Sequence, residues 1–307
     1  MTNTVHVRVP ASTANLGPGF DALGLALALY DEVEVTPVAS GLRVEVHGEG
    51  AGQVPTDEEH LVVRALRAAC ARCGYRPDGL VLRCHNSIPH SRGLGSSAAA
   101  AVAGVLAGYA LAGMKADHAV LDLVAGFDGH ADNAGASLVG GLAICWKDDQ
   151  SFRAVRLEPH PDLMPVVLIP EMTSATEVTR GLLPAEVPHI DAAFTAGRAA
   201  LLVHALTAAP SLLLAATEDR LHQPYRRTAY PATGRLVDAL RSAGVPAAVS
   251  GAGPTVLALP ATGELPAVVD TAGFTQRRLD VAREGAAVRR GDPSIRGPVV
   301  AAGAPDR

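Results

Sequence analysis

A glycine-rich segment that runs directly into a long uncharged stretch constrains this chain most. Residues 88–99 read Ile-Pro-His-Ser-Arg-Gly-Leu-Gly-Ser-Ser-Ala-Ala, and no charged residue occurs from Gly93 to Met114. Glycine has no Cβ, so Gly93 and Gly95 let the backbone turn sharply and approach an anion closely. The segment therefore predicts a tight loop that feeds a buried helix.

The start of that helix is a candidate phosphate site. Free N–H groups of a first helical turn, together with the positive end of the helix dipole, favour an anion. Ser96 or Ser97 is expected to cap the helix, and a serine hydroxyl there is also suited to Mg²⁺. The alternative is a loop whose glycines only close a turn.

Composition excludes several classes of protein. The 307 residues are enough for two domains, and the net charge of −5 offers no basic field for nucleic acid. Aromatic residues make up only 4%, which argues against a surface that stacks bases. The uncharged stretch is mostly Ala and Gly, so it suits a packed core helix better than a membrane span. The N-terminus has no basic segment followed by an apolar one, so a cytoplasmic protein without a signal peptide is expected.

The four cysteines carry little functional information. Cys70 and Cys73 have a C-x-x-C spacing, but no second such pair accompanies them, and Cys84 and Cys145 stand alone. A zinc or redox site remains an alternative. Buried thiols in a reducing compartment are the simpler interpretation.

The pattern along the chain predicts an α+β protein with two domains. Alternating or short apolar runs predict strands at 5–10, 31–37, 42–47, 80–85, 140–146, 166–169, 247–249 and 255–259. Helical periodicity predicts helices at 58–73, 97–114, 117–127, 191–208, 211–219 and 234–243. Residues 11–21 are expected to form a loop. Three prolines in 158–165 suggest a boundary, which gives domains at 1–160 and 165–288 and a disordered tail at 289–307.

Six ordered segments carry a resemblance to a known family. They are Pro10–Asp21, the glycine loop Pro89–Ala99, Gly129–Asn133, Thr179–Pro184, Asp219–Arg226 and the second glycine motif Ser250–Pro254. Together they resemble the small-molecule kinase superfamily of galactokinase, homoserine kinase, mevalonate kinase and phosphomevalonate kinase. The segment Ala-Ser-Thr-Ala-Asn-Leu-Gly-Pro-Gly-Phe-Asp at 11–21 resembles the first motif of the homoserine kinase family in particular.

The resemblance implies a fold and a reaction. The fold is an N-terminal α+β ATP-binding domain and a ferredoxin-like C-terminal domain, with the active site between them. The reaction transfers the γ-phosphoryl group of ATP, with Mg²⁺, to the side-chain hydroxyl of L-homoserine, on the way to threonine. Family members are often homodimers, and neither a nucleic acid nor a membrane partner is implied.

The resemblance also implies the site residues. The acceptor is a zwitterion, so Asp21 is expected to bind its ammonium group, and Arg180 and Arg226 its carboxylate. Asn15 and His130 add polar contacts. Residues with other roles could occupy these positions: Asp21 as a loop residue, the arginines as surface residues, and His130 as a core histidine.

The resemblance further implies that the nucleotide and metal residues lie in the glycine loop and in the segment before Asn133. The residues expected to bind ATP are Pro89, Ser91, Arg92, Gly93, Leu94, Gly95, Ser96, Ser97 and Ala98. Ser97 and Asp128 are expected to hold Mg²⁺, with Asp122 as the alternative carboxylate. Asn133 is assigned an orienting role in catalysis, and the general base is left unassigned.

The chain departs from the family pattern at several positions. Asp128 replaces a Glu, Ala131 a Pro, His60 an Asn and Thr195 an Asn, and residues 134–136 read Ala-Gly-Ala. These departures leave open a kinase for a related hydroxy amino acid or another small alcohol. A sensor that binds a nucleotide or an amino acid without catalysis is the alternative from a different class.

Overall fold

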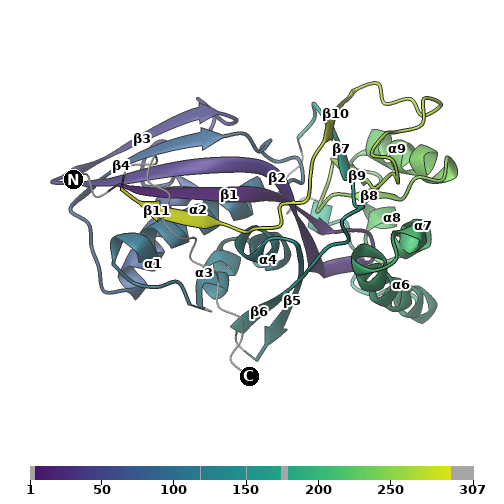
Figure 1. Ribbon diagram of the computed structural model, residues 1–307, viewed down its shortest axis with the longest axis horizontal. Coiled ribbons are helices and arrows are strands. Elements are labelled where there is room, and N and C mark those ends of the chain that lie inside the picture. The colour runs from purple at the N-terminus through teal and green to yellow at the C-terminus, as the bar shows by residue number, and fades with distance from the viewer. Residues whose placement is uncertain (1–3, 118, 150, 174–178, 292–307) are drawn as a thin grey trace.

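The N-terminal half is a sheet with helices packed on one face (Figure 1). The computed structural model describes residues 4–117, 119–149, 151–173 and 179–291. In these residues seven strands form the sheet, in the order β11-β1-β2-β4-β3, with β5 on β2 and β6 on β5. Their bounds are β1 Val5–Asn15, β2 Gly19–Val38, β3 Gly41–Gly48, β4 Gly79–Asn86, β5 Leu142–Asp148, β6 Ser151–Leu157 and β11 Ala287–Arg290. The pairs are antiparallel except β3–β4, which is parallel and joined by a crossover through α1.

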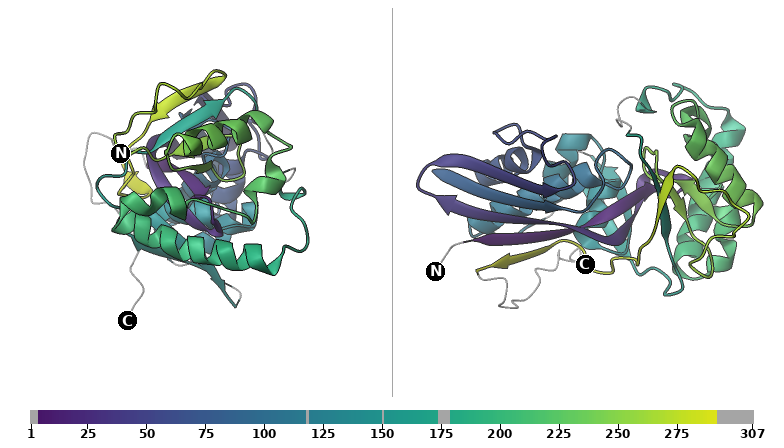
Figure 2. Two further views of the ribbon diagram at one scale, coloured as in Figure 1. Left: turned by 90° about the vertical axis from the view of Figure 1, so that its right-hand side faces the viewer. Right: turned by 90° about the horizontal axis from the view of Figure 1, so that it is seen from above.

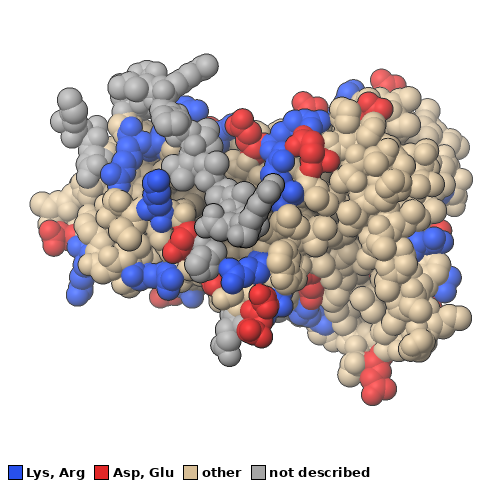
Figure 3. All heavy atoms as spheres, turned by 60° about the horizontal axis from the view of Figure 1, so that its bottom comes forward, with Lys and Arg blue, Asp and Glu red and all other residues tan. Residues whose placement is uncertain are grey.

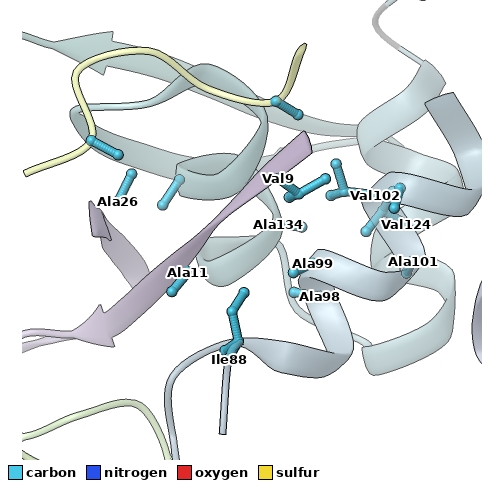
Figure 4. Packing of buried hydrophobic residues seen from close by; sticks show 14 of the residues in the cluster. Val9, Ala11, Ala26, Ile88, Ala98, Ala99, Ala101, Val102, Val124 and Ala134 are labelled. Carbon is cyan, nitrogen blue, oxygen red and sulfur yellow. The ribbon is translucent and has the colours of Figure 1, made fainter. Parts of the chain in front are cut away.

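The four helices of this half share the core beneath the sheet. They are α1 Leu61–Arg72, α2 Ser96–Leu111, α3 Ala119–Asp128 and α4 Asp132–Val139. Figure 4 shows side chains of β1 (Val9, Ala11) and of α2 (Ala98, Ala99) within one cluster. These small side chains bring helix and sheet together, which accounts for the uncharged Ala-rich sequence of α2.

Two glycines of α2 set its distance from α1. A Cβ on Gly104 would lie 2.4 Å from the carbonyl oxygen of Val62. A Cβ on Gly108 would lie 2.7 Å from the carbonyl oxygen of Leu66. The two helix backbones are therefore closer than any residue with a side chain would allow. Within the described residues no helix is long and apolar enough to cross a membrane.

The C-terminal half is a second layer of sheet and helices beside the first (Figure 2). Its antiparallel sheet has the order β10-β7-β9-β8. The strands are β7 Val166–Pro170, β8 Ala247–Val249, β9 Val256–Ala258 and β10 Phe274–Arg278. The helices are α6 His189–Thr207, η1 Pro210–Leu212, α7 Leu213–Ala216, α8 Gln223–Arg226 and α9 Pro231–Ser242. The α+β class and the ferredoxin-like second domain are as expected.

Three predictions about segments need correction. The expected loop at 11–21 is strand at both ends, because β1 continues to Asn15 and β2 begins at Gly19. The expected helix at 211–219 is the short pair η1 and α7, ending at Ala216. Arg289 and Arg290, assigned to the tail, lie in β11 and pair with His6 and Val5. The rest of that tail, 292–307, lies outside the described residues.

The chain also returns to the first sheet earlier than the predicted boundary at 288. The N–H of Ala28 donates to the carbonyl oxygen of Asp280, and the N–H of Ala282 donates to that of Ala26. Local patterns cannot reveal such a return, because the pairing depends on strands near the other end of the chain.

The outer face of the first sheet carries a row of neighbouring polar side chains. His6, Glu34, Arg83 and Glu45 follow one another across β1, β2, β4 and β3, with N–O distances of 3.0–3.8 Å between neighbours. Figure 3 shows basic and acidic residues interspersed on one face of the molecule. Such mixed charge is consistent with the small net charge of the chain.

Candidate active site between the two domains

The glycine loop ends in a helix start whose N–H groups face outward. Gly95 occupies the N-cap position with φ of +71°, a conformation that favours glycine. The N–H of Ala99 donates to the carbonyl oxygen of Gly95 at 2.9 Å, which closes the first turn of the helix. Among the described residues no side chain caps this helix, so the expected capping by Ser96 or Ser97 is wrong. The N–H groups of the first turn remain available for an anion.

The two glycine motifs pack directly against each other. Ser250 Oγ donates to the carbonyl oxygen of Gly93 at 2.6 Å, and the N–H of Thr255 donates to that of Arg92 at 3.2 Å. A Cβ on Gly93 would lie 2.3 Å from the carbonyl oxygen of Ser250. Gly93 is therefore required by a close approach within the protein, as well as by its φ of +81°.

Arg92 ties the loop to the second domain. Its Nε donates to the carbonyl oxygen of Pro170 at 3.1 Å, and its Nη2 donates to that of Glu171 at 2.9 Å. These carbonyls lie at the end of β7 and just after it. The guanidinium is therefore engaged with backbone that leads toward the segment carrying Arg180.

One cavity of about 370 Å³ gathers most of the predicted site residues. Those that line it are Asn15, Asp21, Ser91, Gly93, Gly95, Ser96, Ser97, Ala98, Asp128, His130, Asn133, Arg180 and Arg226. Phe127, Asp132, Gly251 and Ala252 complete the lining. Pro89, Arg92 and Leu94 do not line it; Pro89 and Leu94 are buried beneath the loop.

Asp21 and Arg180 meet as a two-point ion pair across this cavity. Arg180 Nη2 lies 2.7 Å from Asp21 Oδ1, and Nη1 lies 3.1 Å from Oδ2. Each side chain is 34% exposed. A carboxylate has about four acceptor positions, so Asp21 retains capacity for a further cation.

Arg226 is a buried cation at the same cavity. It is 1% exposed, and among the described residues no carboxylate oxygen lies within 4 Å of its guanidinium. Its Nε donates to the carbonyl oxygen of Thr179 at 3.4 Å, and its Nη1 lies 3.2 Å from His222 Nδ1. Burial lowers the pKa of Arg226 below its usual value. A buried charge without a close counter-ion is costly, so this position favours an anionic ligand.

Asn15 joins two backbone segments of the site by hydrogen bonds of its side-chain amide. Its Nδ2 donates to the carbonyl oxygen of Gly251 at 2.8 Å, and its Oδ1 accepts the N–H of Asp21 at 3.0 Å. One hydrogen and one lone pair of this amide remain for a ligand. Asn15, Asp21 and Ser91 all have φ between +54° and +66°. Left-handed backbone at residues other than glycine is a form of strain that is common at functional sites.

Ser97 and Asp128 bring a hydroxyl oxygen and a carboxylate together at the cavity. Ser97 lies in the first turn of α2, Asp128 ends α3, and Ser97 Oγ donates to Asp128 Oδ1 at 3.0 Å. Asp122, the alternative carboxylate, instead accepts the N–H of Phe152 at 2.5 Å, in strand β6. A hydroxyl and a carboxylate suit Mg²⁺, which keeps several waters and takes further oxygens from phosphate groups. The donors present therefore fit the metal.

Asn133 is oriented by a buried serine that the sequence did not single out. Ser12 Oγ donates to Asn133 Oδ1 at 2.9 Å, and Asn133 Nδ2 donates to Asp132 Oδ1 at 3.4 Å, so one hydrogen of the amide nitrogen remains for a ligand. A Cβ on Gly95 would lie 2.1 Å from Ser12 Oγ, which places this contact directly under the glycine loop. Burial raises the pKa of the neighbouring Asp132 to about 6.

A second cavity of about 240 Å³ adjoins the first. It shares Ser91, Ser96 and Ser97 with the first cavity. Its other apolar lining residues are Val33, Val54, Pro55, Leu61, Val62, Ala99, Ala100 and Ala103, and its other polar ones are Asp31, Glu59, His60, Asn86 and His90. His60 Nδ1 is buried and has no hydrogen-bond partner among the described residues. Burial lowers the pKa of His60, so the ring is neutral near pH 7.

Sequence reasoning did not identify Ser12, Phe20 or His222 as functional, although all three lie in the motifs. Phe20 stacks on His222 with ring centroids 5.0 Å apart, and the guanidinium groups of Arg180 and Arg226 lie 5.3 Å and 5.4 Å from the centroid of the Phe20 ring.

The cysteines form no metal or redox site in the part of the chain that the structure describes. Among the described residues no cluster of three metal-ligating side chains occurs, and all four thiols are free. Burial raises the pKa of Cys70 to about 11, so this thiol is unreactive at pH 7.

Comparison with known proteins agrees with this geometry. The family model "GHMP kinases N terminal domain" matches residues 60–141, and "GHMP kinases C terminal" matches residues 197–270. The homoserine kinase of Streptomyces coelicolor is 52% identical over 290 residues, covering 92% of this chain and 94% of that protein. The homoserine kinase of Rhodococcus erythropolis is 51% identical over 296 residues, covering 91% and 94%.

Solved structures show the same relationship. The crystal structure of homoserine kinase from Cytophaga hutchinsonii matches with a TM-score of 0.81 and 26% identity, covering 94% of this chain and 98% of that one. A putative homoserine kinase from Listeria monocytogenes matches with a TM-score of 0.74 and 27% identity, over 94% and 100%. The chain therefore belongs to the homoserine kinases of the GHMP kinase family.

Proposed function

We propose that this protein transfers the γ-phosphoryl group of ATP to the side-chain hydroxyl of L-homoserine, giving O-phospho-L-homoserine. The observation that carries the proposal is the single cavity in which Asp21, Arg180 and Arg226 face the first turn of α2. The cavity thus combines sites for both charges of an amino acid with a site for phosphate.

The acceptor would be held by its two charges. Arg226, buried without a close carboxylate, binds the α-carboxylate, and Arg180 adds a second guanidinium. Asp21 binds the ammonium group with the acceptor positions that Arg180 leaves free. Burial lowers the pKa of His130, so this residue offers a neutral ring as a polar contact.

The nucleotide would span the two cavities. The base occupies the smaller, apolar cavity, where the unpartnered Nδ1 of His60 is available to hydrogen-bond it. The phosphates reach the first turn of α2 through the shared residues Ser91, Ser96 and Ser97. Ser97 and Asp128 would hold Mg²⁺, which supplies charge neutralisation on the transferred phosphoryl group.

Alignment of the acceptor hydroxyl with the phosphoryl group would supply most of the remaining catalysis. Phosphoryl transfer has a loose transition state, so a hydroxyl positioned in line with the phosphorus needs no strong base. The remaining hydrogen of the Asn133 amide nitrogen is available to orient the hydroxyl or a phosphate oxygen, because Ser12 and Asp132 hold the rest of the amide.

The test is ADP release measured with L-homoserine, L-threonine, L-serine, mevalonate and galactose. Turnover fastest with L-homoserine is expected, since its hydroxyl lies one carbon farther from the two charges than that of serine. Turnover only with another alcohol would reject the assignment. Binding of ATP and an amino acid without ADP release would identify a sensor instead.

Two further proposals rest on the family resemblance alone. We propose that the protein is a homodimer and that it works in the cytoplasm. Light scattering coupled to gel filtration would give a mass near twice that of the chain. Cell fractionation would recover the protein with cytoplasmic markers.

A further inference from the structure

We propose that His222 is a positioning residue that locks Arg226 in its carboxylate-binding orientation and thereby sets the affinity for the acceptor. The inference deepens the proposed function, since it rests on Arg226 binding the carboxylate of L-homoserine. His222 does not line the cavity, so it acts only through its neighbours.

The contacts of His222 define which ring nitrogen carries the proton. Its Nε2 lies 2.8 Å from the carbonyl oxygen of Gly17, which can only accept. Its Nδ1 lies 3.2 Å from Nη1 of Arg226, which can only donate. The proton therefore resides on Nε2, and Nδ1 accepts a hydrogen bond from the guanidinium.

Burial keeps this arrangement intact. The side chain of His222 is 0% exposed, and its desolvation holds the pKa below the usual value for histidine. The charged groups that face it are Asp219, Arg226 and Asp21. Asp219 Oδ2 lies 3.6 Å from Nε2 but accepts the backbone N–H groups of His222 and Gln223 at 3.1 Å and 2.8 Å. Asp219 thus fixes the backbone that presents the ring.

The ring also fixes the turn that carries the other half of the acceptor site. It stacks on Phe20, next to Asp21, with an interplanar angle of 25°. A Cβ on Gly17 would lie 2.4 Å from the carbonyl oxygen of Thr217, so this turn is clamped against the second domain. Through Gly17 and Arg226, His222 connects the turn between β1 and β2 with helix α8.

Two substitutions separate the two hydrogen bonds. His222→Asn keeps an oxygen near the position of Nδ1, which can accept from Arg226, but does not reach Gly17. His222→Gln reaches the position of Nε2 and can donate to Gly17, but supplies no acceptor at Nδ1. Losing a hydrogen bond to a charged group costs about 1.5–3 kcal/mol, which corresponds to roughly a tenfold or greater change in affinity.

The experiment measures kcat and both KM values for each variant, with melting temperatures as the check on folding. We expect His222→Gln to raise the KM for L-homoserine at least about tenfold with little change in kcat or in the KM for ATP. His222→Asn should recover most of that loss. Equal effects of the two variants on the KM for L-homoserine, or a fall in kcat alone, would overturn the proposal.

A double mutant gives an independent readout. In an Arg226→Ala background, His222→Gln should add little to the KM for L-homoserine, because the group that it positions is gone. Additive effects would show that His222 acts elsewhere. If the wild-type protein has no homoserine-dependent turnover, the proposed function fails and this inference with it. Normal wild-type turnover with an unchanged KM in His222→Gln overturns only the role of His222.

Discussion

At the scale of single residues, the chemistry of this site depends on neighbours that hold the reactive groups. Asn15 uses its amide to join two backbone segments, and Ser12 turns the amide of Asn133. Arg180 pairs with Asp21, whereas Arg226 is buried with no carboxylate within 4 Å among the described residues. The two arginines therefore differ in how a ligand would meet them. A carboxylate that binds Arg180 shares that residue with Asp21, whereas one that binds Arg226 supplies a close counter-ion that the described residues do not.

The first prediction compares two adjacent arginines. Arg226→Ala should raise the KM for L-homoserine by about 10²-fold or more, because a buried cation facing the carboxylate is lost, while the KM for ATP changes little. Arg227→Ala is the matched control, since Arg227 is an exposed partner of Asp238 and should behave as wild type. Equal changes in both KM values for Arg226→Ala would place this residue outside the acceptor site.

The second prediction separates the two candidate metal carboxylates. Asp128→Asn should raise the Mg²⁺ concentration for half-maximal activity by about tenfold or more, because one charged ligand is removed beside Ser97. Asp122→Asn should leave this concentration unchanged, since Asp122 bonds to the backbone of β6. Activity is measured as ADP release against Mg²⁺ concentration. The reverse ranking of the two variants would make Asp122 the ligand.

At the scale of elements, the packing of helix α2 supports the proposed phosphate site. Its N-terminal turn faces the cavity, and its Ala and Gly side chains pack closely on β1 and α1. Close packing on both sides leaves the first turn little freedom to move. The fixed position of the proposed phosphate site is thus a consequence of small side chains along the whole helix.

The third prediction tests this packing with a matched pair of glycines. Gly104→Ala should lower the free energy of unfolding by about 1–3 kcal/mol, because the new Cβ would meet the backbone of Val62. Gly126→Ala, in α3, has no atom within 4 Å of the new Cβ and should be neutral or stabilising by up to about 1 kcal/mol. Chemical denaturation of both variants gives the comparison, and similar stabilities would contradict the packing argument.

At the scale of the whole molecule, the site exists because the two halves close on each other. The glycine loop and Asp128 come from the first half, and Arg180 and Arg226 come from the second. Arg92, Ser250 and the returning strand β11 connect the halves at separate points. Substitutions that weaken the contacts between the two halves are expected to weaken the binding of acceptor and nucleotide together.

The fourth prediction concerns stability and pH. Asp31 receives the N–H groups of Ser87 and Ile88, just before the glycine loop, and burial raises its pKa from 3.8 to about 6. The folded state therefore holds a proton that the unfolded chain has lost between pH 4 and 6, and wild-type stability from this group falls as pH rises through that window. Above pH 6 the loss is on the order of 3 kcal/mol.

Asp31→Asn keeps an oxygen that accepts both N–H groups but does not titrate. Its stability relative to wild type should rise between pH 4 and 6 and then level off. Chemical denaturation at pH 4, 5, 6 and 7 measures the difference, so that the titration of Asp132 and of other groups cancels. A difference that does not vary with pH would show that Asp31 has a normal pKa in the folded protein.

The sequence predicted most of the elements and most of the residues around the cavity. Local alternation and helical periodicity located strands such as 80–85 and helices such as 97–114 to within a few residues. Predictions failed where a contact from far along the chain decided the outcome. The segment 11–15 is strand because it pairs with β2, and Arg289 and Arg290 are strand because they pair with β1.

The sequence by itself determined the glycine loop and the α+β class, because both depend on residue types at short spacing, where local sterics decide. The charged residues that suit a zwitterion lie far apart in the sequence, and it was the resemblance to a known family that pointed to them. Only the tertiary structure decided that Arg226 is buried without a carboxylate in contact among the described residues, that Asp128 rather than Asp122 meets Ser97, and that His222 stands behind Arg226. Which side chains are buried, and which groups they contact, depends on packing between segments that are distant in the sequence, so no local pattern predicts it.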